Sequence, residues 1–122
     1  MAINANQNLL GKLIVVLRRH EEAVARLRRA EWTELLEAVQ WATRRLGDAF
    51  APDHFNYAFL QNEDRHVHLH VIPRYARPRR FADGVFVDAA WPDHYEVGVT
   101  NAVGAEVIDA IRDALAVDTR NR

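Results

Sequence analysis

The chain has 122 residues and no cysteine, with 49% hydrophobic residues, 27% charged residues and a formal net charge of −1. This length suits one globular domain with a buried core, and the lack of cysteine excludes a disulfide framework or a zinc site built on thiolates. The near-neutral charge gives no general electrostatic reason for the protein to bind nucleic acid or an anionic membrane.

The N-terminal sequence carries no recognisable targeting segment. Asparagine occupies positions 4, 6 and 8, and no basic-then-apolar leader opens the chain. No apolar run approaches the ~18 residues that a membrane span requires. We therefore expect a soluble cytoplasmic protein without a membrane partner.

The first half of the chain predicts one strand and one long helix. Residues 13–17 form a short β-branched run between Gly11 and a basic pair, which is typical of a buried strand. From Ala30 to about Phe50, apolar residues recur at the i, i+3, i+4 spacing of an amphipathic helix, and Pro52 then ends the helix. The residues of the expected apolar stripe are Trp32, Leu35, Leu36, Val39, Leu46 and Phe50.

The second half predicts short strands followed by a terminal helix. Residues 53–61 and 65–72 read as an antiparallel pair of strands, joined by a polar connection of hairpin length. Residues 75–80 form a basic segment that proline holds out of regular structure, and a short strand is expected within residues 81–87. Residues 105–115 have the pattern of an amphipathic helix. The chain therefore predicts an α+β domain with a mainly antiparallel sheet of about five strands, one long helix and a C-terminal helix.

Half of the six histidines fall within five residues, as His66, His68 and His70. Because side chains alternate between the two faces of a strand, the three imidazoles share one face, and the apolar residues between them share the other. One face can then be buried in a core. The other presents the side chains best suited to nucleophilic attack and proton transfer near neutral pH.

Three kinds of site fit this pattern. A His-x-His pair on a strand can supply zinc ligands, although no acidic pattern nearby completes such a site. A purely structural role would need a hydrogen-bond partner for each buried imidazole. A neutral imidazole is also a good nucleophile toward phosphorus, and the phosphoramidate that forms is labile enough to turn over. Further candidate ligands for the metal alternative are His20, His54 and His94.

The stretch His66–Tyr75, in which three histidines alternate with apolar residues before Pro-Arg-Tyr, resembles the signature of the histidine triad (HIT) family of nucleotide hydrolases and transferases. Residues 55–62 resemble the preceding strand of that family, and residues 9–20 resemble its early strand. The resemblance spans Asn4 to Tyr75. It implies one HIT-like domain over residues 1–122, with the triad motif at 66–72 and a C-terminal extension from about residue 76. Proteins of this kind are usually homodimers.

The resemblance also implies a mechanism. His68 would attack the α-phosphorus of a nucleoside polyphosphate or phosphoramidate and form a covalent nucleotidyl-histidine, which water then hydrolyses. His70 would contact the phosphoryl oxygens and help the leaving group depart, and His66 would orient His68 through its backbone carbonyl. Gln61 or Asn62 would donate a hydrogen bond to the phosphate. No cofactor would be tightly bound, although Mg²⁺ would accompany a polyphosphate substrate.

Two features depart from the family pattern. The usual Gly-His pair is Gly11-Lys12 here, and lysine is a compact cation suited to a polyphosphate rather than a neutral acceptor. Asn4, eight residues before Lys12, stands where the family holds ribose hydroxyls, but asparagine is also a common turn residue. Relatives commonly carry a further segment before this position, which walls the base pocket. We expect an adenine nucleotide as ligand, and a catalytically weak nucleotide-binding or sensor module remains the alternative to an enzyme.

Overall fold

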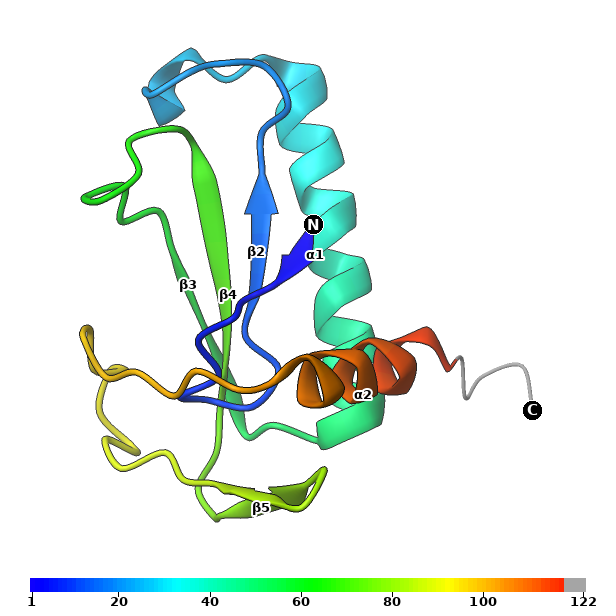
Figure 1. Cartoon of the computed structure of the whole chain (residues 1–122). Helices are drawn as coiled ribbons and strands as arrows, with labels where there is room; N and C mark the ends of the chain where they lie inside the picture. The colour runs from blue at the N-terminus through cyan, green and yellow to red at the C-terminus, as the bar shows by residue number, and fades with distance from the viewer. Residues whose placement is uncertain (118–122) are drawn as a thin grey trace.

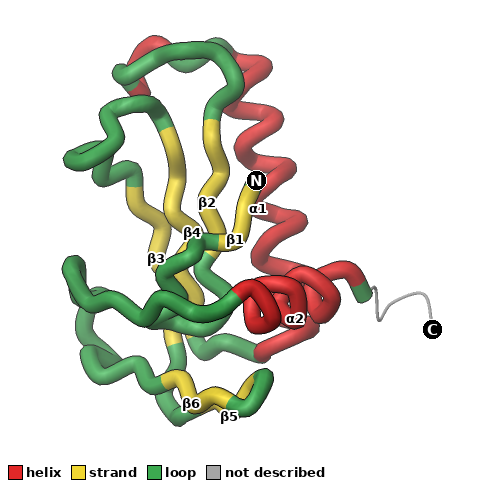
Figure 2. Tube along the Cα trace, viewed as in Figure 1, coloured by secondary structure: helices red, strands yellow, loops and turns green. Residues whose placement is uncertain are grey.

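The structure is a computed structural model, and it describes residues 1–117. A four-stranded antiparallel sheet has the strand order β1-β2-β4-β3, and a separate two-stranded hairpin follows it. Helix α1 runs along one face of the sheet, and α2 crosses the C-terminal end of α1 (Figures 1 and 2). The strands are β1 (Ala2–Ile3), β2 (Leu13–Val16), β3 (His54–Ala58), β4 (His68–Arg74), β5 (Arg79–Phe81) and β6 (Gly84–Phe86), and the helices are η1 (Val24–Arg26), α1 (Arg29–Phe50) and α2 (Ala105–Ala116).

The α+β class and the two helices agree with the sequence analysis, whereas the strands differ in detail. The main sheet has four strands rather than about five, because the C-terminal strands pair only with each other. The last two residues of the basic segment, Arg79 and Arg80, lie in β5, so only its first residues are outside regular structure. The strand expected over residues 65–72 begins only at His68 and runs to Arg74.

The core lies between the sheet and α1. Leu69 and Val71 of β4 point toward the helix, where Leu46 is completely buried. Gly11 lets the chain pass close to this helix: its φ is +86°, and a Cβ there would lie 2.7 Å from a methyl carbon of Leu46. The remaining members of the buried core cluster are Leu10, Leu13, Ala42, Phe50, Tyr75, Phe86, Ile111 and Leu115.

Helix α1 buries a narrower stripe than its periodicity predicts. Leu46 and Phe50 are buried as expected, but Trp32 is 43% exposed and Leu36 is 56% exposed, so these two do not belong to the core. The helix ends at Ala51, whose left-handed backbone precedes Pro52. Within residues 1–117, no helix has the length and apolar character needed to cross a membrane.

The C-terminal half of β4 is fixed by a buried ion pair. Arg74 is 1% exposed, and its guanidinium donates to the carboxylate of Asp88 at 2.6 and 3.0 Å and to the side-chain oxygen of Asn56 at 2.7 Å. The same carboxylate accepts the backbone N–H of Tyr75 at 3.1 Å. Arg74 is buried because Asp88, in the connection after β6, covers it.

Removing Asp88 should destabilise the fold strongly. Asp88→Ala leaves the buried guanidinium of Arg74 without its counter-charge, and we expect the free energy of unfolding to fall by about 3–5 kcal/mol. Urea unfolding followed by circular dichroism measures this loss. Asp48→Ala, an exposed position on α1, is the matched control and should stay within ~0.5 kcal/mol of the wild type. Equal stability of Asp88→Ala and the wild type would contradict this role of the ion pair.

Candidate functional site

Two of the three clustered histidines lie side by side on β4. The rings of His68 and His70 have centroids 4.9 Å apart and meet edge to face. On the neighbouring strand β2, Val16 lies opposite His68 and Ile14 lies opposite His70. His66 is outside the strand, in the bend that precedes it. The expected face of three imidazoles on one strand is therefore a pair on β4 with a third imidazole before it.

One hydrogen bond places a proton on Nδ1 of the His68 ring. Its Nδ1 lies 2.7 Å from the backbone carbonyl oxygen of His66. A carbonyl oxygen only accepts, so Nδ1 must carry the proton, and in the neutral ring the lone pair is then on Nε2. The backbone contact expected from the sequence is thus present. In the neutral form of His68, Nε2 is therefore the nitrogen available as a nucleophile.

His70 is kept neutral by its surroundings. Burial lowers the pKa of its imidazole, and the charges of His68 and Lys12 lower this pKa further. Each cause disfavours the charged form of the ring. At neutral pH His70 therefore has one N–H to donate and one lone pair.

Lys12 supplies the positive charge of this face. It is 7% exposed, and its ammonium donates to the side-chain oxygen of Asn8 at 2.7 Å. Burial lowers the pKa of Lys12 from its usual value. Since Leu13 pairs with Val71 at the start of β2, Lys12 precedes the strand on the side of the sheet that carries His70.

Gln7, which the sequence analysis did not single out, holds the turn before Lys12. Its side chain is fully buried, and its oxygen accepts the N–H of Gly11 at 2.7 Å. Its amide nitrogen donates to the backbone carbonyls of Asn4 at 2.7 Å and Lys12 at 3.0 Å. A glutamine among asparagines gives no sign of burial, because its partners lie on backbone that only the folded turn brings together.

Two of the other expected binding residues, Asn4 and Gln61, are held by hydrogen bonds to the protein, and Asn4 lies beside Lys12, whose backbone carbonyl accepts the Asn4 N–H at 3.0 Å. Asn4 is a turn residue, since its side-chain oxygen accepts the N–H of Asn6 at 2.9 Å. The amide nitrogen of Gln61 donates to the carbonyls of Glu22 and Arg65, at 2.7 Å each. Gln61 and Asn62 line a small hollow to which none of the three histidines contributes. Of the two donors to phosphate that the resemblance implies, Gln61 thus has its amide nitrogen bonded to backbone carbonyls.

A cavity between the sheet and α1 also lies away from the histidine pair. It has a volume of about 430 Å³ and opens between β2 and the N-terminal half of α1. Its lining includes the apolar side chains of Val15, Leu17, Leu35 and Phe59 together with charged ones such as Arg19 and Glu31. Val15 and Leu17 alternate with Val16, so their side chains are on the opposite face of the sheet from His68. Among residues 1–117, no group of three or more histidine, aspartate or glutamate side chains is arranged to hold a metal ion.

Comparison with known proteins gives a family match and several structural neighbours. A family model for the HIT domain matches residues 4–77, which is more than half of the chain. No curated protein gives a match. A histidine triad protein from Bradyrhizobium japonicum is similar in structure, with a TM-score of 0.68 and 24% identity, over 93% of this chain and 81% of that one.

Two further solved structures are similar. A hypothetical histidine triad nucleotide-binding protein from Sulfolobus tokodaii has a TM-score of 0.66 and 16% identity, over 93% of this chain and 72% of that one. A Hit-like protein from Bartonella henselae, described as involved in cell-cycle regulation, has a TM-score of 0.61 and 16% identity, over 94% of this chain and 74% of that one. At these identities the neighbours show the shared fold.

The charge of Lys12 should be measurable at His70. Lys12→Met removes a positive charge that disfavours the imidazolium, so the pKa of His70 should rise toward its usual value. Titration of the histidine ring protons by NMR measures this change. Arg80→Met, which removes an exposed cation from β5, is the control and should leave this pKa unchanged. An unchanged or lower pKa of His70 in Lys12→Met would show that the ammonium does not act on this ring.

Proposed function

The chain belongs to the HIT family, and from this premise we propose that it is a nucleotide hydrolase or nucleotidyl transferase. The reaction takes place at the α-phosphorus of a nucleoside polyphosphate or phosphoramidate, with an adenine nucleotide favoured by the family resemblance. The observation that carries the proposal is the 2.7 Å hydrogen bond from His68 Nδ1 to the His66 carbonyl. It gives His68 the tautomer that covalent catalysis requires.

In the first step, Nε2 of His68 attacks the α-phosphorus. The new P–N bond forms as the bond from phosphorus to the leaving oxygen or nitrogen breaks, and the leaving group takes that electron pair. Nδ1 keeps its proton, which it donates in the hydrogen bond to the His66 carbonyl. The imidazole of the intermediate is therefore positively charged. This charge makes His68 a good leaving group in the second step, in which water attacks phosphorus and releases a proton to solvent while the P–N electron pair returns to Nε2.

His70 and Lys12 support this reaction from the same face. The neutral ring of His70 offers an N–H to a phosphoryl oxygen or to the leaving atom. Lys12 adds the cation that a charged phosphate needs, and a hydrogen bond to a charged group contributes about 1.5–3 kcal/mol. Exposed Val16 and partly exposed Ile14 give an apolar surface for the base beside the two histidines. Mg²⁺ enters with a polyphosphate substrate, bound to its phosphates.

A covalent adduct tests the proposal. The protein is mixed with an adenosine phosphoramidate or a diadenosine polyphosphate and quenched, and mass spectrometry measures the gain of one adenylate. We expect the adduct on His68, and its loss in His68→Ala, with turnover lower by about 10³-fold or more.

The matched control is His54→Ala, which removes an exposed histidine of β3 and should keep the adduct and the rate. Absence of both adduct and product with either substrate would contradict an enzymatic function. The protein would then be a nucleotide-binding module of the same fold, with Lys12 as the first position to examine.

We also propose that two copies associate beside β3. This strand is an edge of the sheet, and exposed apolar side chains accompany it: Tyr57 is 51% exposed, Leu60 43%, Trp32 43% and Leu36 56%. Trp32 is close to β3, since its ring meets that of Phe59 edge to face at 6.3 Å. An exposed strand edge with an apolar surface is suited to pairing with a second copy.

Light scattering at high protein concentration tests this association. We expect a mass near twice the 14.0 kDa of one chain, and a mass near 14.0 kDa for Leu36→Glu, because burying the new carboxylate in the interface is costly. Val85→Glu, at an exposed position of β6, is the control and should keep the larger mass. A wild-type mass near one chain would contradict the dimer.

A further inference from the structure

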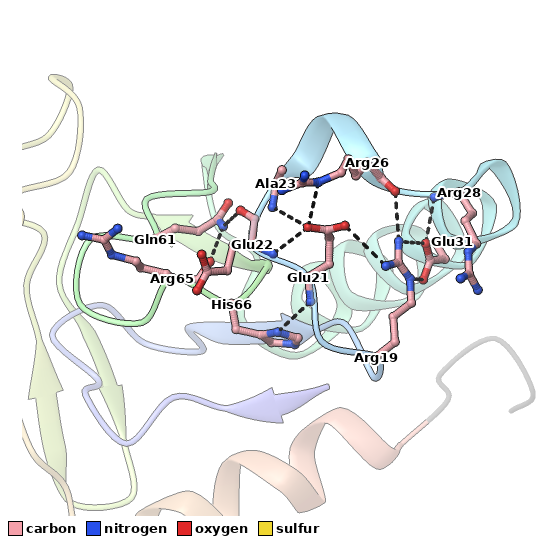
Figure 3. A network of polar contacts seen from close by, with 10 residues as sticks. All are labelled: Arg19, Glu21, Glu22, Ala23, Arg26, Arg28, Glu31, Gln61, Arg65 and His66. Carbon is pink, nitrogen blue, oxygen red and sulfur yellow. Dashed lines mark hydrogen bonds and ion pairs between the residues drawn. The ribbon is translucent and has the colours of Figure 1, made fainter.

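The connection between β2 and α1 is built as a polar network (Figure 3). At its far end, the carboxylate of Glu31 accepts two hydrogen bonds from the guanidinium of Arg19, at 2.8 and 2.9 Å. The same guanidinium donates to the backbone carbonyl of Arg26 at 2.9 Å. The Arg19 guanidinium, together with the N–H of Arg28, lowers the pKa of Glu31 to about 2. This network holds the connection to the first turn of α1.

The carboxylate of Glu21 closes the turn in the middle of the connection. One of its oxygens accepts the N–H of Glu22 at 2.9 Å, the N–H of Ala23 at 3.1 Å and the guanidinium N–H of Arg26 at 3.2 Å. These bonds hold the backbone of Glu21 in one direction. The side chain of Glu21 therefore orients the backbone N–H and carbonyl of the same residue.

The backbone of this connection holds the segment before β4. The carbonyl of Glu21 accepts the N–H of Val67 at 2.8 Å, and the N–H of Leu17 donates to the Val67 carbonyl at 3.2 Å. The ring of His66 is held at both nitrogens: Nε2 donates to the Leu17 carbonyl at 2.6 Å, and Nδ1 accepts the Glu21 N–H at 3.5 Å. His20 stacks on this ring with a centroid distance of 5.6 Å.

Gln61 secures the same segment from the side of the β3–β4 loop. Its amide nitrogen bridges the carbonyls of Glu22 and Arg65, so one side chain joins the connection to the residue before His66. Figure 3 shows Gln61 between these two stretches of backbone, on the side of the network away from Arg19. His66 and its carbonyl are consequently fixed by contacts on both sides.

We propose that Glu21 and Gln61 are positioning residues for the nucleophile, acting through the backbone carbonyl of His66 on the tautomer and direction of the His68 ring. This inference rests on the proposed function, because it assigns these residues to the step in which His68 Nε2 attacks phosphorus. The chain of contacts is continuous: Glu21 and Gln61 hold residues 65–67, and the carbonyl of His66 at their centre accepts a hydrogen bond from His68 Nδ1 at 2.7 Å.

The first measurement is the tautomer of His68, observed by nitrogen-15 NMR of the histidine rings. In the wild type we expect the proton on Nδ1. In Glu21→Ala and in Gln61→Ala we expect a mixture of the two neutral tautomers, because the His66 carbonyl is no longer held in place. The controls Glu22→Ala and Glu63→Ala remove exposed carboxylates of the same two loops and should give the wild-type spectrum.

The second measurement separates positioning from simple destabilisation. In a single-turnover reaction with adenosine phosphoramidate, we expect both variants to form the adduct with a rate constant about 10-fold lower and an unchanged amplitude. A merely structural role would lower the amplitude, through the fraction of folded protein, and leave the rate constant. Glu21→Gln keeps an oxygen that accepts the N–H groups of Glu22 and Ala23, so it should recover the wild-type rate and tautomer.

The outcomes of the two measurements distinguish failure of this inference from failure of the proposed function. A wild-type tautomer of His68 in Glu21→Ala and Gln61→Ala would overturn the inference even if the wild type forms the adduct. If Glu21→Ala does not fold, the tautomer of His68 is still measured in Gln61→Ala, which alters only one exposed loop. A tautomer mixture in the variants, together with a wild type that forms no adduct, would support the positioning role and overturn the proposed function instead.

Discussion

A backbone carbonyl accepts a hydrogen bond but cannot donate one, and the 2.7 Å contact between the His66 carbonyl and His68 Nδ1 therefore leaves His68 only one neutral tautomer. The site depends on this constraint. Nε2 is available to phosphorus, and the ring becomes a cation once it is bonded there. His70, neutral through burial and neighbouring charge, and Lys12, a buried cation, add a donor and a charge on the same face.

The fold positions His68 and His70 by holding β4 along its length and at both of its ends. Leu69 and Val71 anchor the strand in the core under α1, and the buried pair of Arg74 and Asp88 fixes its far end. At the near end, where His66 lies, Val67 is buried as well. This end is held by backbone hydrogen bonds from the connection before α1, which explains why a polar network stands at this end of the strand.

The sequence predicted the features that depend on local pattern. The periodicity gave α1 to within one residue at its start and placed its end at Phe50, and alternation placed His68 and His70 on one face. The sequence pattern could not predict contacts between segments that are far apart in the chain. Gln61 meets a carbonyl 39 residues away in the chain, and Trp32, read as part of the core stripe, lies outside it. Helix periodicity reports which side chains share a face, but not how wide a stripe the sheet covers.

A crystal structure with adenosine monophosphate tests the central claim most directly. The account predicts that the phosphate lies against His68 Nε2, within hydrogen-bond reach of His70 and Lys12, while Nδ1 keeps its bond to the His66 carbonyl. A phosphate bound in the hollow beside Gln61 and Asn62, or facing Nδ1 with the carbonyl bond broken, would contradict the account.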